Sequence, residues 1–504
     1  MSEHTQHSHT ENGAVAFHST DNPIVDFFAM YNRGIDTEQL CQHLENCWSF
    51  DAKKTIAIIF NARDRENGKK EKNISNRAMI WLRRKKNNTY KKNIQTYIDK
   101  YGCWNDCVYI AIKNPLNNNL EIEFITNQLK KDKICLDSGD YQKISLCAKW
   151  TSSEKDKADR EFNLAHKIAD ELFPNDNKKM QKYRKEFLVP LRNQIKIVES
   201  YMTSNRWTDI AYDKVPAVAS KRLRNAFMKH DPEGYKAYQQ KVAKGEKQIK
   251  VTGLLPHELI GYYLHNQTAE LDETIELQWK ALLENVKATG MLKNMLAIVD
   301  VSGSMYDDSS VKCIDVAMAL GLLIAECNVG PLHKKVISFH IEPKLIEVNG
   351  NTLYEQVKHL KDIPAGLNTD FEAVFNLLID SAKMFNIPPE QMPDTIVVLS
   401  DMQFDEAACA NSSGISEKTM HQTVISKYEK TVYKPPKIVY WNLSSKFNNT
   451  FPIKSVTENV AIISGFSEQL LKVFMNNSNY NAQQIVYEIL SKYENDIEID
   501  SQDL

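Results

Sequence analysis

The chain has 504 residues, with 63 Lys and Arg against 65 Asp and Glu, and a formal net charge of −2 at pH 7. This length favours two to four domains, and the 42% of hydrophobic residues indicates a folded chain rather than a disordered one. No apolar run approaches the roughly 18 residues of a membrane helix, and none of the nine cysteines forms a Cys-x-x-Cys pair. We therefore expect neither a membrane protein, nor a secreted one, nor one with structural zinc.

The first 290 residues are basic and the rest are acidic. Residues 1–290 carry a net charge of +8, residues 291–504 carry −10, and the last arginine of the chain is Arg224. Such an asymmetry favours two domains with different partners, although two halves that attract each other would show it too.

The N-terminal part of the chain has a helical pattern. Residues 1–22 are polar and predict a disordered tail. From 23 to 290, apolar residues recur at intervals of three and four, which predicts an α-helical domain of HEAT-like repeats. Pro190 interrupts one such run and predicts a kink or a break. The stretch 120–144 is ambiguous, and a short hairpin is one alternative.

The pattern changes after Gly290. Short apolar segments at 295–299, 336–339, 395–399, 438–441 and 461–463 alternate with amphipathic ones. This alternation predicts a second domain over 291–504, an α/β doubly wound, Rossmann-like sheet. In such sheets, ligands bind at the carboxyl ends of the strands.

Polar side chains occupy that edge of the predicted sheet. Asp300, Ser302 and Ser304 follow the first strand, Thr369 opens a later helix, and Asp401 follows the strand at 395–399. Carboxylate and hydroxyl oxygens are ligands that hard dications prefer. The sequence therefore predicts a metal site for Mg²⁺ or Mn²⁺.

This pattern resembles the metal-ion-dependent adhesion site of von Willebrand factor A domains, over about residues 291–504. The resemblance implies that Ser302, Ser304 and Thr369 coordinate the ion directly, whereas Asp300 and Asp401 act largely through water. It also implies that an exposed Asp or Glu of a protein partner completes the coordination.

Segments along most of the chain are similar to an uncharacterised family of plants, fungi and large DNA viruses. They include NPIVDFFAMYNRG, YGCWND and VYWN. The order of a helical region and an A domain is similar to that of the Ro (TROVE) ribonucleoproteins, in which helical repeats bind RNA. The cysteine usage favours a reducing compartment, so we expect a cytoplasmic protein, or a virion protein if the chain comes from a large DNA virus.

Three basic clusters in the helical part are an alternative basis for function, since cations contact phosphates and release counterions. The aromatic residues Phe227 and Tyr235 lie among them and are candidates for base stacking. The candidate RNA-binding residues are Arg83, Arg84, Lys85, Lys86, Arg184, Arg192, Arg222 and Arg224.

Enzyme motifs are missing from the sequence. There is no GxxxxGK[ST], no GxSxG and no HExxH. A phosphotransfer enzyme of the haloacid dehalogenase type needs an acid two residues after Asp300, where Ser302 stands. We therefore expect a non-enzymatic scaffold or adaptor, with Ro-like RNA binding as the alternative and a Mg²⁺-dependent phosphotransfer enzyme as the third hypothesis.

Overall fold

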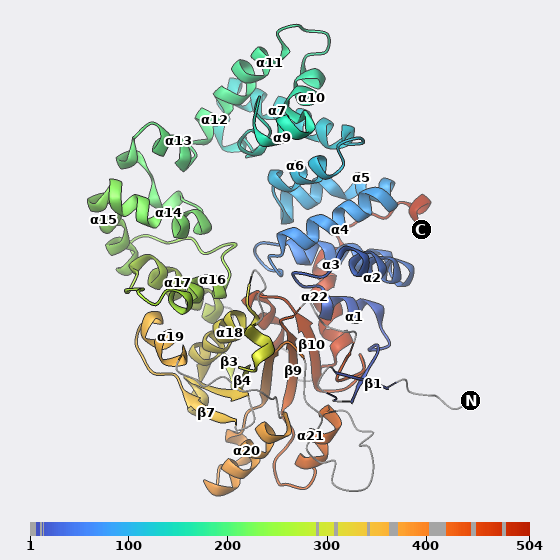
Figure 1. Cartoon of the computed structure of the whole chain (residues 1–504), viewed down its shortest axis with the longest axis vertical. Coiled ribbons are helices and arrows are strands. Elements are labelled where there is room, and N and C mark those ends of the chain that lie inside the picture. Colours follow the sequence, from blue (N-terminus) through green and yellow to red (C-terminus); the bar gives the residue numbers. More distant parts are fainter. Residues whose placement is uncertain are drawn as a thin grey trace. The chain divides into compact units, whose positions relative to one another are not determined.

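The computed structural model contains two compact units, and each is formed from separate stretches of the chain (Figure 1). The sheet unit comprises Met1–Asn61, Glu66–Glu71 and Ile249–Asn495. The helical unit comprises Ala62–Arg65, Lys72–Gln248 and Asp496–Leu504. The structure describes residues 7–10, 13, 15–288, 292–306, 311–339, 343–361, 371–402, 420–444, 450–475 and 480–504.

A six-stranded sheet with the order β10-β9-β8-β4-β6-β7 forms the centre of the sheet unit. Neighbouring strands are parallel, except that the edge strand β7 is antiparallel to β6. The chain leaves β4 toward β6 and later returns to its other side at β8, so the strand order reverses beside β4. The strands are β4 (Met295–Asp300), β6 (Lys335–Phe339), β7 (Lys344–Glu347), β8 (Thr395–Ser400), β9 (Lys437–Asn442) and β10 (Val460–Ser464), and a separate short pair is formed by β3 (Leu292–Lys293) and β5 (Asn328–Val329).

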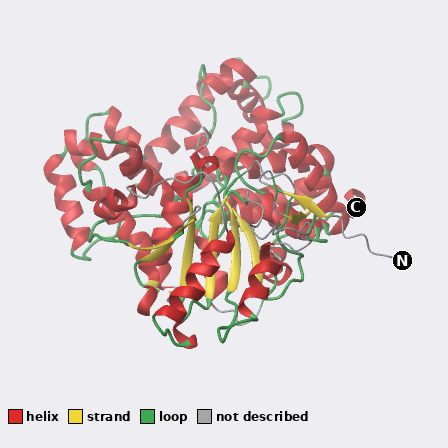
Figure 2. Cartoon of the chain, turned by 60° about the horizontal axis from the view of Figure 1, so that its bottom comes forward, coloured by secondary structure: helices red, strands yellow, loops and turns green. Residues whose placement is uncertain are grey.

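Helices cover this sheet (Figure 2). Every residue of β4 and β8 is buried, as is typical of strands that are covered on both faces. The alternation predicted after residue 290 is thus confirmed as a mixed, mainly parallel sheet with helices. These helices are α18 (Cys313–Cys327), α19 (Leu353–Lys361), α20 (Phe371–Met384), α21 (Met420–Tyr428) and α22 (Ala482–Glu494).

Helices from before residue 290 complete the sheet unit. The helix α1 packs against β9 and β10, and α16 packs against α18. Asn442 of β9 donates from Nδ2 to the Ala29 carbonyl oxygen at 3.0 Å. The compact units therefore do not follow the predicted boundary at 290, because these amphipathic helices bury their apolar faces against the sheet. The helices concerned are α1 (Pro23–Met30), α2 (Thr37–Phe50), α3 (Ala52–Arg63), α16 (Pro256–His265) and α17 (Glu273–Ala288).

The segment predicted as a disordered tail is partly ordered. The strands β1 (His7–His9) and β2 (Val15–Phe17) pair with each other. Phe17 is 7% exposed and exchanges two backbone hydrogen bonds with Phe451, at 2.8 and 2.7 Å. The mainly polar composition of residues 1–22 did not predict this order, because it depends on a few apolar residues such as Phe17. Their backbone partner, Phe451, is more than 400 positions away in the sequence.

The helical unit confirms the predicted α-helical region. Its HEAT-like repeat character remains a prediction. The ambiguous stretch 120–144 forms most of the 20-residue helix α7, not a hairpin. The α-helices that follow α3 are α4 (Lys72–Lys85), α5 (Asn87–Thr96), α6 (Trp104–Lys113), α7 (Asn119–Ser138), α8 (Cys147–Trp150), α9 (Lys157–Phe162), α10 (Leu164–Leu172), α11 (Lys179–Lys182), α12 (Val189–Ile195), α13 (Val198–Thr203), α14 (Ala217–His230) and α15 (Pro232–Ala243).

The helix does not break at Pro190. A π-helical segment over Tyr183–Leu188 leads directly into α12, and Leu188 and Val189 both have right-handed helical backbone angles. The change from π-helical to α-helical geometry just before Pro190 is consistent with a residue that cannot donate a backbone hydrogen bond.

Candidate metal centre

The ends of two adjacent strands bring the predicted acidic residues together. The strands β4 and β8 are parallel, with Val299 opposite Leu399. Asp300 therefore ends β4 beside the point where Asp401 follows β8. Both side chains are buried, at 0% and 5% exposure. This is the edge at which the strand order reverses and at which open α/β sheets bind ligands.

Neutral donors hold the carboxylate of Asp300. Its Oδ1 accepts from the Ser302 backbone amide at 2.9 Å, and its Oδ2 accepts from the Ser400 hydroxyl at 2.6 Å. Burial raises the pKa of Asp300 to about 7, and the nearby Asp401 carboxylate acts in the same direction. Two buried acids that disfavour each other's charge form a site that a cation would relieve.

The two serines of the predicted motif also lie together. They belong to the turn after β4, which continues as a single helical turn over Gly303–Tyr306. The hydroxyl oxygens of Ser302 and Ser304 are 3.2 Å apart. Ser302 is buried and Ser304 is exposed. Two adjacent hydroxyls beside a buried carboxylate are a suitable donor set for a hard dication.

Ser400 is a residue of this site that the sequence-based prediction left out. Its hydroxyl donates to Asp300 and also accepts from the Met402 amide at 3.0 Å. Met402 has a positive φ of 69°, so the chain turns sharply directly after Asp401. The signal was present in the sequence, because Ser400 directly precedes Asp401 at the end of an apolar strand.

The remaining predicted ligand, Thr369, lies outside the described residues. Within the part of the chain that the structure describes, no three His, Cys, Asp or Glu side chains are grouped to hold a metal ion. A cation at this edge would therefore depend on hydroxyl oxygens as well as on Asp300 and Asp401.

The predicted RNA-binding residues have varied environments in the helical unit. Arg83 is 8% exposed and donates to Glu121 at 2.9 Å, to Asn87 at 2.5 Å and to the Asn117 carbonyl oxygen at 3.0 Å. Arg192 is likewise engaged within the fold, donating to the Ala148 and Thr151 carbonyl oxygens and to Ser153.

The other candidates differ in exposure. Arg84 is exposed but donates to Asn114 and to the Lys113 carbonyl oxygen. Lys86 donates to the Asp503 carbonyl oxygen, and Arg224 donates to that of Lys221. The exposed candidates are Arg84, Lys85, Arg184 and Arg222.

The aromatic residues near the third basic cluster are not available for base stacking. Phe227 and Tyr235 are 0% and 1% exposed, and their ring centroids are 5.3 Å apart. They pack with Tyr212 and Tyr238 in a small core of the helical unit. This corrects the prediction that Phe227 and Tyr235 stack on bases.

No helix among the described residues is both long and apolar enough to cross a membrane. Two family models match the sequence. Residues 10–123 and 122–292 match "Domain of unknown function (DUF2828)", and residues 294–503 match "Domain of unknown function (DUF7788)".

A viral protein is similar along almost the whole chain. The uncharacterized protein L728 of Acanthamoeba polyphaga mimivirus is 32% identical over 515 residues, which cover 96% of this chain and 87% of that protein. Among solved structures, the Ro (RSR) protein of Deinococcus radiodurans has 12% identity and a TM-score of 0.31, over 94% of this chain and 100% of that one. Similarity at that score does not establish a common fold. The expectation of an uncharacterised family with viral members is confirmed, and the chain belongs to the DUF2828 family.

Proposed function

We propose that the sheet unit is a divalent-cation-dependent binding module that holds a carboxylate of a protein partner, and that the protein is a non-enzymatic adaptor. The arrangement of Asp300 with the hydroxyls of Ser302, Ser304 and Ser400 at the ends of β4 and β8 supports this proposal. Ser302, Ser304 and Asp401 would hold Mg²⁺ or Mn²⁺ together with Asp300, and Thr369 is a further expected ligand. A cation with few charged ligands remains able to accept an outside carboxylate.

The exposed Ser304 offers a test that spares the fold. Ser304→Ala removes one hydroxyl, and we expect at least about tenfold weaker Mg²⁺ or Mn²⁺ binding in isothermal titration, or about 1.4 kcal/mol. Ser491→Ala is a matched control, because Ser491 is exposed on α22 and its hydroxyl donates only to its own helix, at the Glu488 carbonyl oxygen. Equal ion affinity in the wild type, Ser304→Ala and Asp300→Ala would contradict the proposed metal site.

The partner's chemistry is tested separately. The full chain would be used to select peptides from a random library in Mg²⁺, with elution by EDTA. We expect the eluted peptides to be enriched in Asp and Glu, and the enrichment to disappear for Ser304→Ala. Ion binding without such enrichment would leave the metal site standing and would refute the capture of a carboxylate.

We propose RNA binding by the helical unit as the second function, supported by the net charge of +8 over residues 1–290 and by the exposed Arg84, Lys85, Arg184 and Arg222. Filter binding over a salt series tests it, because each lost phosphate contact reduces the slope of log RNA affinity against log salt concentration by about one. Arg184→Ala with Lys185→Ala should show such a loss. The absence of RNA affinity at about 150 mM salt, where screening is physiological, would refute this function.

A further inference from the structure

A second cavity lies in the sheet unit, along α21, and it is lined by different residues from the candidate metal centre. It has a volume of about 580 Å³, within the range of small-molecule sites. One wall is α21, with His421 and Ile425. The other walls are the segment before β9, with Pro435 and Pro436, and the segment before β10, with Glu458.

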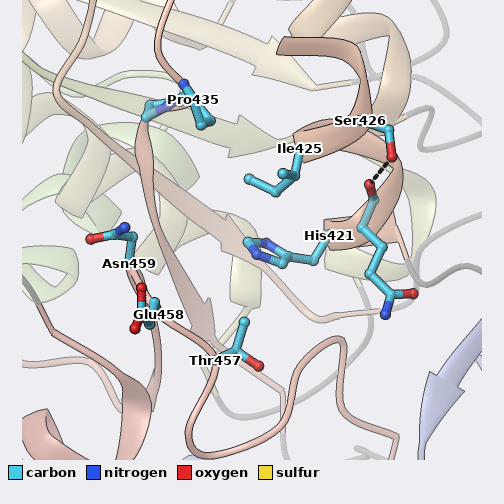
Figure 3. A pocket seen from close by; sticks show the side chains of 9 residues that line it. His421, Ile425, Ser426, Pro435, Thr457, Glu458 and Asn459 are labelled. Carbon is cyan, nitrogen blue, oxygen red and sulfur yellow. Dashed lines mark hydrogen bonds between the residues drawn. The ribbon is translucent and has the colours of Figure 1, made fainter. Parts of the chain in front are cut away.

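His421 points from α21 into this cavity (Figure 3). Its ring is 5% exposed and packs edge-on against Tyr440, with ring centroids 6.3 Å apart. Its Nδ1 atom is buried and has no hydrogen-bond partner among the described residues. Because buried polar atoms are nearly always paired in folded proteins, an unpaired nitrogen in a side chain that lines a cavity is a candidate hydrogen-bond acceptor for a ligand.

The charge of the cavity is set by Glu458. Its side chain is exposed, and no ion pair or hydrogen bond to that carboxylate is found among the described residues. Lys427 on α21 pairs with Glu372 and Lys454 pairs with Asp21, whereas Lys434 and Lys437 flank the two lining prolines. Among the described lining residues, Glu458 is the one with a charged side chain, and none is Lys or Arg.

The wall that carries Glu458 is held firmly by the backbone. Glu458 forms a bridge with Asn481, and the Asn459 amide donates to the Tyr480 carbonyl oxygen at 2.7 Å. The Asn459 carbonyl oxygen in turn accepts from the Ile438 amide at 3.0 Å. A preformed wall keeps the carboxylate in place before a ligand arrives, which lowers the entropic cost of binding.

The hydrogen-bond acceptors of the cavity indicate the kind of ligand that fits it. Burial lowers the pKa of His421 to about 4, so the ring is neutral at physiological pH, and a neutral ring has one nitrogen that accepts a hydrogen bond. A neutral acceptor and a carboxylate together suit a cation with several N–H donors. Ile425, Pro435 and Pro436 provide apolar surface for the body of such a ligand.

We propose that this cavity binds an alkylammonium group, with the ammonium between His421 and Glu458 and the carbon chain along Ile425 and the two prolines. A free diamine or the side chain of a lysine in a partner protein would supply the same group.

Isothermal titration of the full chain in EDTA tests the proposal apart from the metal centre. The probes are putrescine, Nα-acetyl-lysine methylamide and the uncharged 1,4-butanediol. We expect at least one amine to bind and the diol to bind at least about tenfold more weakly. Preference for putrescine indicates a free diamine, and preference for the lysine derivative indicates a protein side chain.

Two variants locate the ligand. His421→Phe keeps an aromatic ring against Tyr440 but removes Nδ1, and Glu458→Gln keeps the shape but removes the charge. Both should weaken amine binding at least about tenfold, whereas Glu429→Gln, an exposed position just beyond α21, should leave it unchanged. The proposal is overturned if neither amine binds, if the diol binds equally well, or if Glu458→Gln binds like the wild type.

Discussion

Two single side chains, Asp300 and His421, are buried in the sheet unit in environments that disfavour their charged forms. Asp300 is held by an amide and a hydroxyl, whereas His421 packs against the ring of Tyr440 and its Nδ1 has no hydrogen-bond partner among the described residues. In both residues, burial disfavours the charged form, which raises the pKa of the acid and lowers that of the base. Such groups are expected to shape the pH dependence of stability as well as the binding proposed above.

His421 should make the folded state sensitive to acid. Its pKa is about 4 in the fold against 6.5 when unperturbed, so the unfolded chain binds more protons between these values. Stability should therefore be unaffected above about pH 6.5 and fall by roughly 3 kcal/mol as the pH drops to 4. Urea unfolding across this pH range should show a smaller loss of unfolding free energy for His421→Phe than for the wild type. His18→Phe, which alters an exposed position, should lose as much unfolding free energy as the wild type. A pH profile of His421→Phe identical to that of the wild type would contradict this assignment.

Between elements, close packing and buried ion pairs hold helices in place. The helix α18 crosses β4 and β8 at Gly321, where an added Cβ would lie 2.6 Å from Val299 Cγ2. In the helical unit, Arg83 of α4 joins Glu121 of α7, and the hydroxyl of Tyr90 on α5 donates to the same carboxylate at 2.8 Å. Neither contact depends on an exposed surface, so both should affect folding rather than binding.

Gly321→Ala should destabilise the sheet unit, because the new methyl group meets a strand side chain inside a filled core. Overpacking of this kind costs about 1–3 kcal/mol. Gly303→Ala is the matched control, since an added Cβ there meets no atom within 4 Å. Chemical denaturation would compare the two, and equal stabilities would show that α18 can move away from β4 at little cost.

The neighbouring arginines Arg83 and Arg84 should respond very differently to truncation. Arg83→Ala leaves Glu121 buried without its partner, which costs about 3–5 kcal/mol. Arg84→Ala removes an exposed side chain and should change stability by less than about 0.5 kcal/mol. Thermal or urea unfolding measures both. A stable Arg83→Ala protein with weakened RNA affinity would show that Arg83 serves binding rather than folding.

At the scale of the whole molecule, the chain passes between the two units several times. The sheet unit includes α1 and α16 from before residue 290, and the helical unit includes Asp496–Leu504 from the C-terminus. In the helical unit, Asp496 accepts from Lys100 and from the Tyr101 hydroxyl, both at 2.5 Å. If the chain is divided near residue 290 into two fragments, each unit therefore loses part of its sequence, and the surface that this part covered is exposed.

The fragment 291–504 should not fold as a cooperative domain. It lacks α1, whose residues Ile24, Val25, Phe27 and Phe28 are all fully buried, so the strand face under α1 would meet water. Each such side chain contributes about 1.5–3 kcal/mol of burial. We expect the fragment to bind a hydrophobic dye and to unfold without a sharp urea transition. A cooperative transition like that of the full chain would show that residues 291–504 hold together without the N-terminal helices.

The sequence by itself determined the classes of structure and one candidate site. Short, wholly apolar segments predicted the strands of the mainly parallel sheet, and apolar residues at intervals of three and four predicted the helical region, because local pattern reflects which faces of an element are buried. The position of Asp300, Ser302, Ser304 and Asp401 at strand ends was predictable for the same reason.

Only the tertiary structure decided the partners of individual residues and the course of the chain between units. The exposed appearance of the basic clusters in the sequence did not distinguish Arg83, which pairs with Glu121, from Arg84. The sequence placed Ser400 at the strand end beside Asp401, but only the structure showed that its hydroxyl donates to Asp300, 100 residues earlier, at 2.6 Å. The two ends of the chain joined different units for the same physical reason, since burial and pairing depend on neighbours that are distant in sequence and close in space.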